Sequence, residues 1–328
     1  MDEVSDVFRF IDLLTGYQPA SAIMAAGRLG VFDALGDDPQ SVEDLAQRLE
    51  ADAPVLGALL GSLAAIGLVI GDDHGFRTTS FVADHLTDGS DLALVVEKEE
   101  YFAGAWLSLE GVVRSGRPAI EPWRSRLESD PATAFMFLDA LNVLAEHTGP
   151  RLWDLPELAP DKRVLDVGGG FGHYARRLAE AGSTVVLVDL PEVVAAIGDR
   201  LDGVPAGSVD LVSADVLAES ACGVGPGSVD AALVSHMLHD LSVEVGTDLL
   251  RRVRAAIAPG GSIVVNDFAG DSGPGAFGPM FDVMMRVETG GAAHSLDSLR
   301  EMVEMSGFED VTVLDLPEPQ TVLTGGRL

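Results

Sequence analysis

The sequence predicts an α/β protein with a doubly wound parallel sheet, preceded by a smaller helical region. Three observations carry this prediction. Apolar residues recur at helical spacing through the first hundred residues. From Arg163 onward, short apolar runs alternate with helical segments, which is typical of parallel strands joined by helices. A stretch of four glycines among residues 168–172 follows the first apolar run directly. The 328 residues suffice for about two domains.

Residues 1–100 have the pattern of a winged-helix-like domain. Helical spacing covers residues 23–35, and Ser41 with Asp44 forms a capping box that begins a second helix through residue 49. Pro54 begins a third helix that ends at Gly67, and residues 68–79 predict a β-hairpin. This region holds 19 acidic and 5 basic residues, whereas proteins that bind DNA grooves have the opposite balance. We therefore expect it to serve dimerisation or packing.

The composition of the whole chain excludes several classes of partner. The formal net charge is −31, which repels phosphate backbones and anionic membrane surfaces, so we expect no nucleic acid and no membrane partner. The single cysteine, Cys222, cannot form an internal disulfide. Met1, Asp2 and Glu3 lack the basic start of a signal peptide, and every apolar run is shorter than the ~20 residues that cross a bilayer. A cytoplasmic location is expected.

Two further segments follow the first domain. Residues 101–157 are again helical and predict a linker whose aromatic side chains contribute to a pocket. Residues 158–328 form the sheet domain. Strands are expected at residues 164–167, 185–188, 209–212, 231–234 and 263–265, with a terminal hairpin at 311–314 and 321–323 after a helix at 296–305. In such sheets, ligands bind beyond the carboxyl ends of the strands.

The glycine stretch predicts a cofactor site at that edge. Asp166 precedes Gly168, Gly170 and Gly172, which allow a tight turn and a close approach of ligand to backbone. A dinucleotide fingerprint would place its third glycine at position 173, which is His, so a nicotinamide cofactor is disfavoured. An acidic side chain at the end of the second strand can hold ribose hydroxyls, and Asp189 is found there, followed by Leu190. After the third strand comes Asp215, followed by Val216.

Together with four further motifs, these residues resemble the S-adenosylmethionine-dependent small-molecule O-methyltransferases that carry an N-terminal dimerisation domain. The motifs are residues 238–241 (LHDL), Arg251-Arg252 followed by residues 258–261 (APGG), Gly290-Gly291, and residues 306–308 (SGF). The resemblance implies a Rossmann-like methyltransferase domain, a homodimer and a small acceptor from secondary metabolism. It assigns cofactor binding to Asp166, Gly168, Gly170, Gly172, Asp189, Leu190, Asp215 and Val216.

The same resemblance points to the reacting residues. His239 matches the general base of many members, and a histidine can take a phenol or acid proton near neutral pH. Asp267, at the end of the fifth strand, matches the position that orients this base. Metal-free O-methylation of a phenol or hydroxy acid by His239 is therefore one hypothesis. A member that does not transfer methyl (a decarboxylase, hydroxylase or pericyclase) is a further alternative.

A departure from the family pattern favours a different chemistry. Where many members carry a glutamate that assists the histidine, residues 292–295 read AAHS. If a helix follows the fourth strand, His236 and His239 share one face of it. With Asp240 and His294 they form a candidate site for Zn²⁺ or Fe²⁺. The set resembles a subgroup that C-methylates α-keto acids at a metal, where Lewis acidity would acidify the adjacent C–H. Metal-assisted C-methylation is the favoured hypothesis.

Overall fold

The structure is a computed structural model that describes residues 6–328. Met1, Asp2 and Glu3, on which the expected location rests, lie outside the described residues. The chain divides into two compact units, Met1–Gly104 and Ala105–Leu328. None of the helices described is long and apolar enough to span a membrane.

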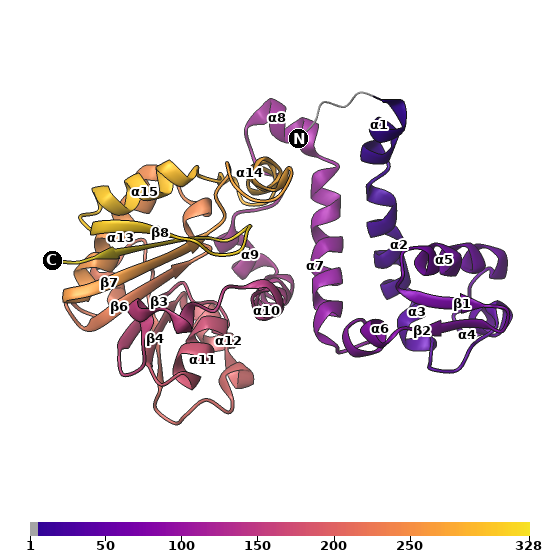
Figure 1. The fold of residues 1–328 in the computed structure, drawn as a ribbon, viewed down its shortest axis with the longest axis horizontal. Coiled ribbons are helices and arrows are strands. Elements are labelled where there is room, and N and C mark those ends of the chain that lie inside the picture. Colours follow the sequence, from indigo (N-terminus) through magenta and orange to yellow (C-terminus); the bar gives the residue numbers. More distant parts are fainter. Residues whose placement is uncertain (1–5) are drawn as a thin grey trace. The chain divides into compact units, whose positions relative to one another are not determined.

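The first unit has the predicted order of helices followed by a hairpin (Figure 1). Ser41 caps α4 by accepting a hydrogen bond from the Asp44 backbone N–H at 3.1 Å, as the capping box predicts. Leu45, Leu60 and Leu63 are fully buried in its core. The elements are α1 (Val7–Leu14), α2 (Tyr17–Arg28), α3 (Val31–Ala34), α4 (Val42–Arg48), α5 (Ala53–Ala65), β1 (Val69–Asp72), β2 (Gly75–Thr78), α6 (Ser80–His85) and α7 (Asp91–Trp106), whose last two residues belong to the second unit.

The second unit begins with helices and continues as an α/β sheet. Its first elements are α8 (Leu109–Ser115), α9 (Trp123–Ser129), α10 (Pro131–Thr148) and the 3-10 turns η1 (Leu152–Asp154) and η2 (Pro156–Leu158). The sheet and its helices follow: β3 (Arg163–Val167), α11 (His173–Glu180), β4 (Thr184–Asp189), α12 (Pro191–Ala196), η3 (Gly198–Leu201), β5 (Val209–Ser213), η4 (Ser220–Gly223), β6 (Val229–Ser235), η5 (Leu238–Asp240), α13 (Val243–Ala256), β7 (Ile257–Asp267), α14 (Phe277–Glu288), α15 (Leu296–Met305), β8 (Glu309–Leu314) and β9 (Thr321–Gly326).

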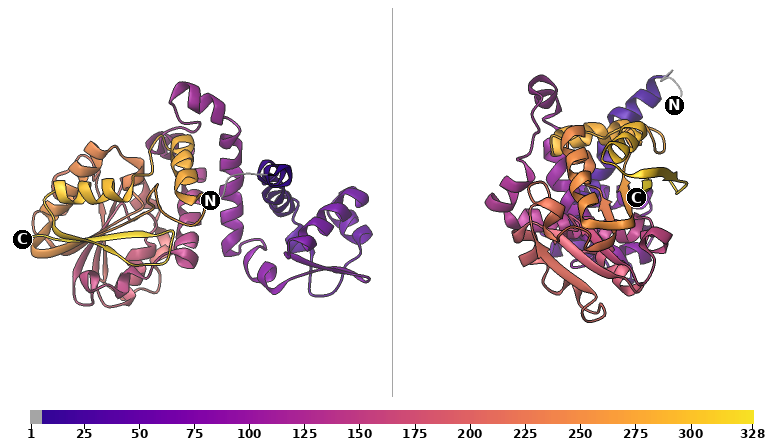
Figure 2. Two further views of the ribbon diagram at one scale, coloured as in Figure 1. Left: turned by 45° about the horizontal axis from the view of Figure 1, so that its top comes forward. Right: turned by 90° about the vertical axis from the view of Figure 1, so that its left-hand side faces the viewer.

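The seven strands lie in the order β5-β4-β3-β6-β7-β9-β8. The first five are parallel, and β9 pairs antiparallel with both β7 and β8. The terminal hairpin therefore joins the sheet as predicted. The doubly wound fold class is confirmed, because helices cover both faces of a mostly parallel sheet (Figures 1 and 2).

Alternation along the strands builds the two halves of the core. Successive side chains of a strand point to opposite faces. Leu165 and Val167 accordingly pack in one buried cluster with residues of α13 and α15. Val164 packs in the other cluster with residues of α11 and α12. The central strands are apolar on both faces and lie between two layers of helices. Polar groups that could bind a ligand are therefore confined to the loops at the strand ends.

Because Leu233 is fully buried in β6, Leu233→Ala should lower the free energy of unfolding by about 2–5 kcal/mol. Leu328→Ala makes the same chemical change at a side chain that is 76% exposed, and we expect a change below about 0.5 kcal/mol. Urea unfolding followed by far-UV circular dichroism measures both. Equal midpoints for the two variants would contradict the assignment of β6 to the core.

Candidate active site

The candidate site lies where the carboxyl ends of four adjacent strands meet. In the order β4-β3-β6-β7, these ends carry Asp189, the glycine loop of residues 168–172, His236 and Asp267. Parallel pairing brings them to one edge, because Val167 pairs with both Val188 and Val234. This is the edge at which ligands bind in open α/β sheets.

The glycine loop has a backbone that other residues would strain. Gly168, Gly170 and Gly172 have φ values of +63°, +55° and +86°, in the left-handed region that favours glycine. The Asp189 carboxylate holds the loop, since Oδ2 accepts the Gly170 N–H at 2.8 Å and Oδ1 accepts the Leu190 N–H at 2.7 Å. The loop is thus fastened to the end of β4, next to the helix α11 that it begins.

Asp166 lies beneath this loop. It is 2% exposed, and its Oδ2 has no hydrogen-bond partner among the residues that the structure describes. A Cβ added to Gly169 would lie 2.8 Å from that oxygen, so a side chain at position 169 would collide with it. Burial, and to a lesser extent the nearby Asp189 charge, raise the pKa of Asp166 to about 7. A cation bound at the loop would reverse this shift.

Asp215 and Val216 follow β5, the neighbour of β4. The Ala214 N–H donates to the Asp189 carbonyl oxygen at 3.0 Å, which ties this segment to the end of β4. Asp215 forms an ion pair with Arg124 at 2.6 Å, and Val216 is 6% exposed. The predicted cofactor residues therefore surround the ends of β3, β4 and β5.

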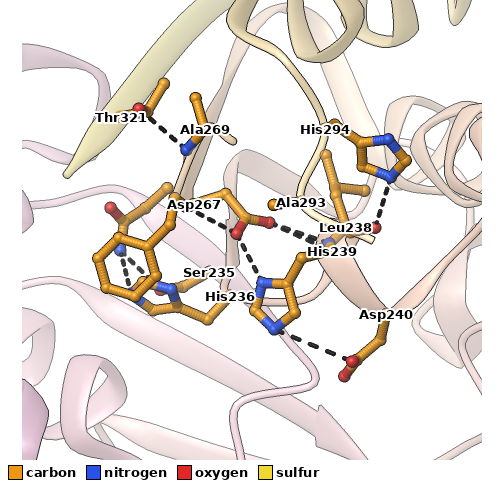
Figure 3. A network of polar contacts seen from close by, with 12 residues as sticks. Ser235, His236, Leu238, His239, Asp240, Asp267, Ala269, Ala293, His294 and Thr321 are labelled. Atoms are coloured by element: carbon orange, nitrogen blue, oxygen red, sulfur yellow. Dashed lines mark hydrogen bonds and ion pairs between the residues drawn. The ribbon is translucent and has the colours of Figure 1, made fainter. Parts of the chain in front are cut away.

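His239 and Asp267 form a buried pair (Figure 3). The His239 Nδ1 lies 2.6 Å from Asp267 Oδ1, and the imidazole is 12% exposed. Asp267 Oδ2 accepts the backbone N–H of Leu238 at 3.1 Å and that of His239 at 3.3 Å. Burial alone would lower the pKa of His239, but the Asp267 charge and hydrogen bond outweigh it and raise the pKa to about 9. The Nε2 atom remains for a ligand.

The predicted helix carrying His236 and His239 is wrong. Strand β6 extends to Ser235, and the His236 N–H continues the ladder by donating to the Asn266 carbonyl oxygen at 2.7 Å. His236 then turns the chain at φ +51°, and η5 begins at Leu238. The two imidazoles are nevertheless neighbours, with ring centroids 6.2 Å apart.

The four predicted metal ligands do not converge. The Nε2 of His294 faces the carbonyl oxygen of Leu238 at 3.1 Å (Figure 3) and that of Leu241 at 2.9 Å, so this imidazole supports η5. The Asp240 carboxylate lies 4.0 Å from His239 Nε2. Within residues 6–328, the potential ligands that gather here are His236, His239 and Asp267, with donor atoms within 4.8 Å of one another. Two of these three already bind each other, so we derive no metal chemistry from the predicted set.

Aromatic rings border the two histidines. Phe281 packs edge-on against His239, with ring centroids 5.2 Å apart, and Phe268 packs against His236, with ring centroids 4.6 Å apart. The ring centroid of Phe268 also lies 5.0 Å from that of Phe281 and 5.1 Å from that of Phe277. Phe268 and Asn266, which flank Asp267 in the chain, are site residues that the sequence did not predict. Their adjacency to Asp267 at a strand end was the available signal.

Comparison with known proteins identifies the family. Residues 112–309 match the O-methyltransferase domain, and residues 11–87 match the O-methyltransferase dimerisation domain. These matches define the class of protein as a two-domain methyltransferase. The chain belongs to the O-methyltransferase family and is an S-adenosylmethionine-dependent methyltransferase.

Named relatives match nearly the whole chain. The phenazine O-methyltransferase PhzM of Lysobacter antibioticus is 25% identical over 91% of this chain and 89% of its own length. The 3-hydroxy-5-methyl-1-naphthoate 3-O-methyltransferase of Streptomyces sahachiroi is 27% identical over 94% and 91%. Among solved structures, "PigF with SAH" superposes with a TM-score of 0.86 at 23% identity, covering 98% of this chain and 99% of that one.

Gly291 offers a test of how η5 is held. A Cβ there would lie 2.1 Å from the His239 carbonyl oxygen and 2.8 Å from the Asp240 Cα. Gly291→Ala should therefore displace η5 and lower both the melting temperature and methyl transfer. Gly61→Ala is the matched control, because nothing lies within 4 Å and helix propensity favours alanine by about 1 kcal/mol. Wild-type turnover in Gly291→Ala would contradict the close contact.

Proposed function

We propose that this enzyme O-methylates a hydroxyl group on a small aromatic acceptor, with His239 as general base and Asp267 as its orienting partner. The observation that carries the proposal is the buried 2.6 Å contact between His239 Nδ1 and Asp267 Oδ1. His239 follows β6, the strand next to β3, and the glycine loop follows β3. That contact leaves Nε2 as the nitrogen that takes a proton from the acceptor.

The residues around β3, β4 and β5 fit S-adenosylmethionine. The orphaned Asp166 Oδ2 suits a ligand ammonium group beneath the glycine loop, and the Asp189 carboxylate at the end of β4 suits ribose hydroxyls. Val216 supplies apolar contact for the adenine. When bound, the cofactor supplies an electrophilic methyl group on a sulfonium. The protein's contribution to the transfer would be to align the acceptor oxygen with that methyl group.

The protein's part in the reaction is to hold the acceptor and move one proton. Neutral His239 keeps a hydrogen on Nδ1 toward Asp267 and accepts the hydroxyl proton at Nε2. Asp267 stabilises the imidazolium that results, as its lowered pKa keeps it ionised. A sulfonium charge nearby would lower the pKa of His239 and so favour the neutral base when the cofactor is bound.

Metal-assisted C-methylation of an α-keto acid, favoured from the sequence, has no support. The relatives include named O-methyltransferases and N-methyltransferases, such as the phenazine-1-carboxylate N-methyltransferase of Pseudomonas aeruginosa, 28% identical over 97% of this chain and 96% of its own length. The predicted set of four also does not converge, because the Nε2 of His294 faces the carbonyl oxygens of Leu238 and Leu241 instead. The alternative, O-methylation, agrees better with the names of the relatives. The dimerisation domain supports a homodimer.

His239→Gln should lower kcat/KM by about a hundredfold to ten-thousandfold, because it removes the base but no cofactor contact. Formation of S-adenosylhomocysteine with aromatic hydroxyl acceptors measures the loss. Calorimetric binding of S-adenosylmethionine, unchanged in the variant, controls for folding. Turnover of His239→Gln at the wild-type rate would contradict the proposal.

The pH dependence of kcat/KM reports the protonation of His239 in its pair with Asp267. Because the pKa of His239 is about 9 in the free enzyme, kcat/KM should rise with pH and level off near 9. Asp267→Asn removes the charge that raises this pKa. The pH at which kcat/KM levels off should therefore fall by at least one unit in this variant, and the maximum value of kcat/KM should also fall. Asp240→Asn is the control, since that carboxylate is 4.0 Å away and exposed, and the pH at which its kcat/KM levels off should fall less. Coincident profiles for wild type and Asp267→Asn would contradict the assignment.

Asp189→Ala tests the cofactor site. Loss of the carboxylate frees the Gly170 and Leu190 amides and removes the ribose partner. We expect the Kd for S-adenosylmethionine to rise at least tenfold in calorimetry, with kcat at saturating cofactor less affected. An unchanged Kd would remove Asp189 from the cofactor site.

A further inference from the structure

The glycine loop contacts two elements that lie apart from it in the chain, helix α10 and the 3-10 turn η3. The ring centroid of Phe135, in α10, lies 5.8 Å from that of Phe171. A Cβ added to Gly172 would lie 2.9 Å from the Cδ2 atom of Leu201, in η3. Phe171 itself stands between Gly170 and Gly172 and is 1% exposed. The loop therefore depends on α10 and η3 for its packing.

Arg200 joins these two elements and contacts the loop. Its guanidinium carbon lies 3.9 Å from the ring centroid of Phe171, which is a cation–π contact. Nε and Nη2 donate to the two carboxylate oxygens of Asp139, in α10, at 2.6 Å each. The third nitrogen, Nη1, donates to the carbonyl oxygens of Ala196 and Ile197 at 2.8 and 3.3 Å. All three nitrogens are thus engaged, and this fixes the orientation of the guanidinium against Phe171.

The ion pair between Arg200 and Asp139 is partly sheltered from water. The two side chains are 29% and 26% exposed, so dissolved salt screens the pair less than one on an open surface. Two parallel hydrogen bonds to one carboxylate also define a geometry that a single contact does not. The backbone of η3 is held as well, because Arg176 of α11 donates to the carbonyl oxygens of Arg200 and Asp202. Arg200 is therefore a rigid support for Phe171.

A second ion pair on α10 has the same chemistry but a different neighbour. Glu146 follows Asp139 by seven residues, about two turns, so both carboxylates lie on one face of α10. The Glu146 carboxylate accepts hydrogen bonds from Nε and Nη2 of Arg177, in α11. The ring that Arg177 contacts is Trp153, 5.8 Å away in η1. Both pairs hold α10, and Arg200 is the arginine of the two that contacts a ring of the glycine loop.

The conformation of this loop determines what it can bind. The Gly170 N–H is already held by Asp189 Oδ2 at 2.8 Å, next to Phe171. A loop that has its binding conformation before the ligand arrives loses less conformational entropy on binding. If the binding conformation is populated only in part, the apparent Kd rises by the inverse of its population. Residues that fix Phe171 can therefore strengthen cofactor binding without contacting the cofactor.

We propose that Arg200 and Asp139 are positioning residues that hold the glycine loop, through Phe171, in the conformation that binds S-adenosylmethionine. The inference rests on the proposed cofactor site at this loop and is independent of the acceptor atom that is methylated. Arg200 and Asp139 act on the affinity for the cofactor and take no part in proton transfer.

Asp139→Asn tests this role, because it keeps the size of the side chain but removes the charge that binds Arg200. The Kd for S-adenosylmethionine, measured by calorimetry, should rise about five- to tenfold, while kcat at saturating cofactor should stay within about twofold. In the cofactor-free protein, the Gly170 amide should exchange its hydrogen faster, because its bond to Asp189 opens more often. Arg200→Lys keeps the charge without the paired hydrogen bonds, and its Kd should be intermediate.

Glu146→Gln is the matched control, since it neutralises the other carboxylate on the same face of α10. It should lower the melting temperature as Asp139→Asn does, with the Kd for S-adenosylmethionine within about twofold of wild type. Equal Kd values for wild type and Asp139→Asn, or equal increases in Asp139→Asn and Glu146→Gln, would overturn this inference. If Asp139→Asn does not fold, a wild-type Kd in Arg200→Lys would overturn it. A wild-type Kd in Asp189→Ala would instead overturn the proposed cofactor site.

Discussion

Four hydrogen bonds converge on the carboxylate of Asp267, and the geometry of the whole site follows from them. Its two oxygens accept the amides of Leu238, His239 and Phe268 and contact the His239 ring. At 1% exposure, an unpaired carboxylate would be strongly unfavourable, and these bonds compensate for its lost hydration. The same bonds tie η5 to the end of β7. One buried charge therefore sets both the position of the base and its basicity.

This arrangement makes the neighbouring imidazoles chemically different although both are shielded from water. His239 contacts a carboxylate and gains a proton easily, while His236 contacts a buried amide and stays neutral. The amide belongs to Asn266 and the carboxylate to Asp267, so the pleat of one strand sends the two polar groups to different neighbours. Two adjacent residues on β7 thus shift the pKa values of two neighbouring imidazoles in opposite directions.

The features that the sequence predicted correctly depend on local chemistry. Apolar alternation and length located the strands, and the glycine spacing located the loop after β3, because each is determined by a few consecutive residues. The expected helix after β6 failed because the ladder between β6 and β7 continues to the His236 N–H. The partners of His294 are carbonyls more than 50 residues away. No local pattern contains that information, and spacing alone suggested a ligand instead.

Residues 292–295, where the resemblance to the family predicts a glutamate that assists the base, begin with two alanines that carry no charge. The Ala292 N–H donates to the His239 carbonyl oxygen at 2.8 Å, so this segment contacts η5 through backbone. A carboxylate side chain beside the imidazole would add a second negative charge and raise its pKa above the value of about 9 that Asp267 already gives. The neutral base would then be scarcer at neutral pH. With Asp267 as the dominant charge, the pKa of His239 stays nearer to the operating pH, which is the condition for an efficient general base.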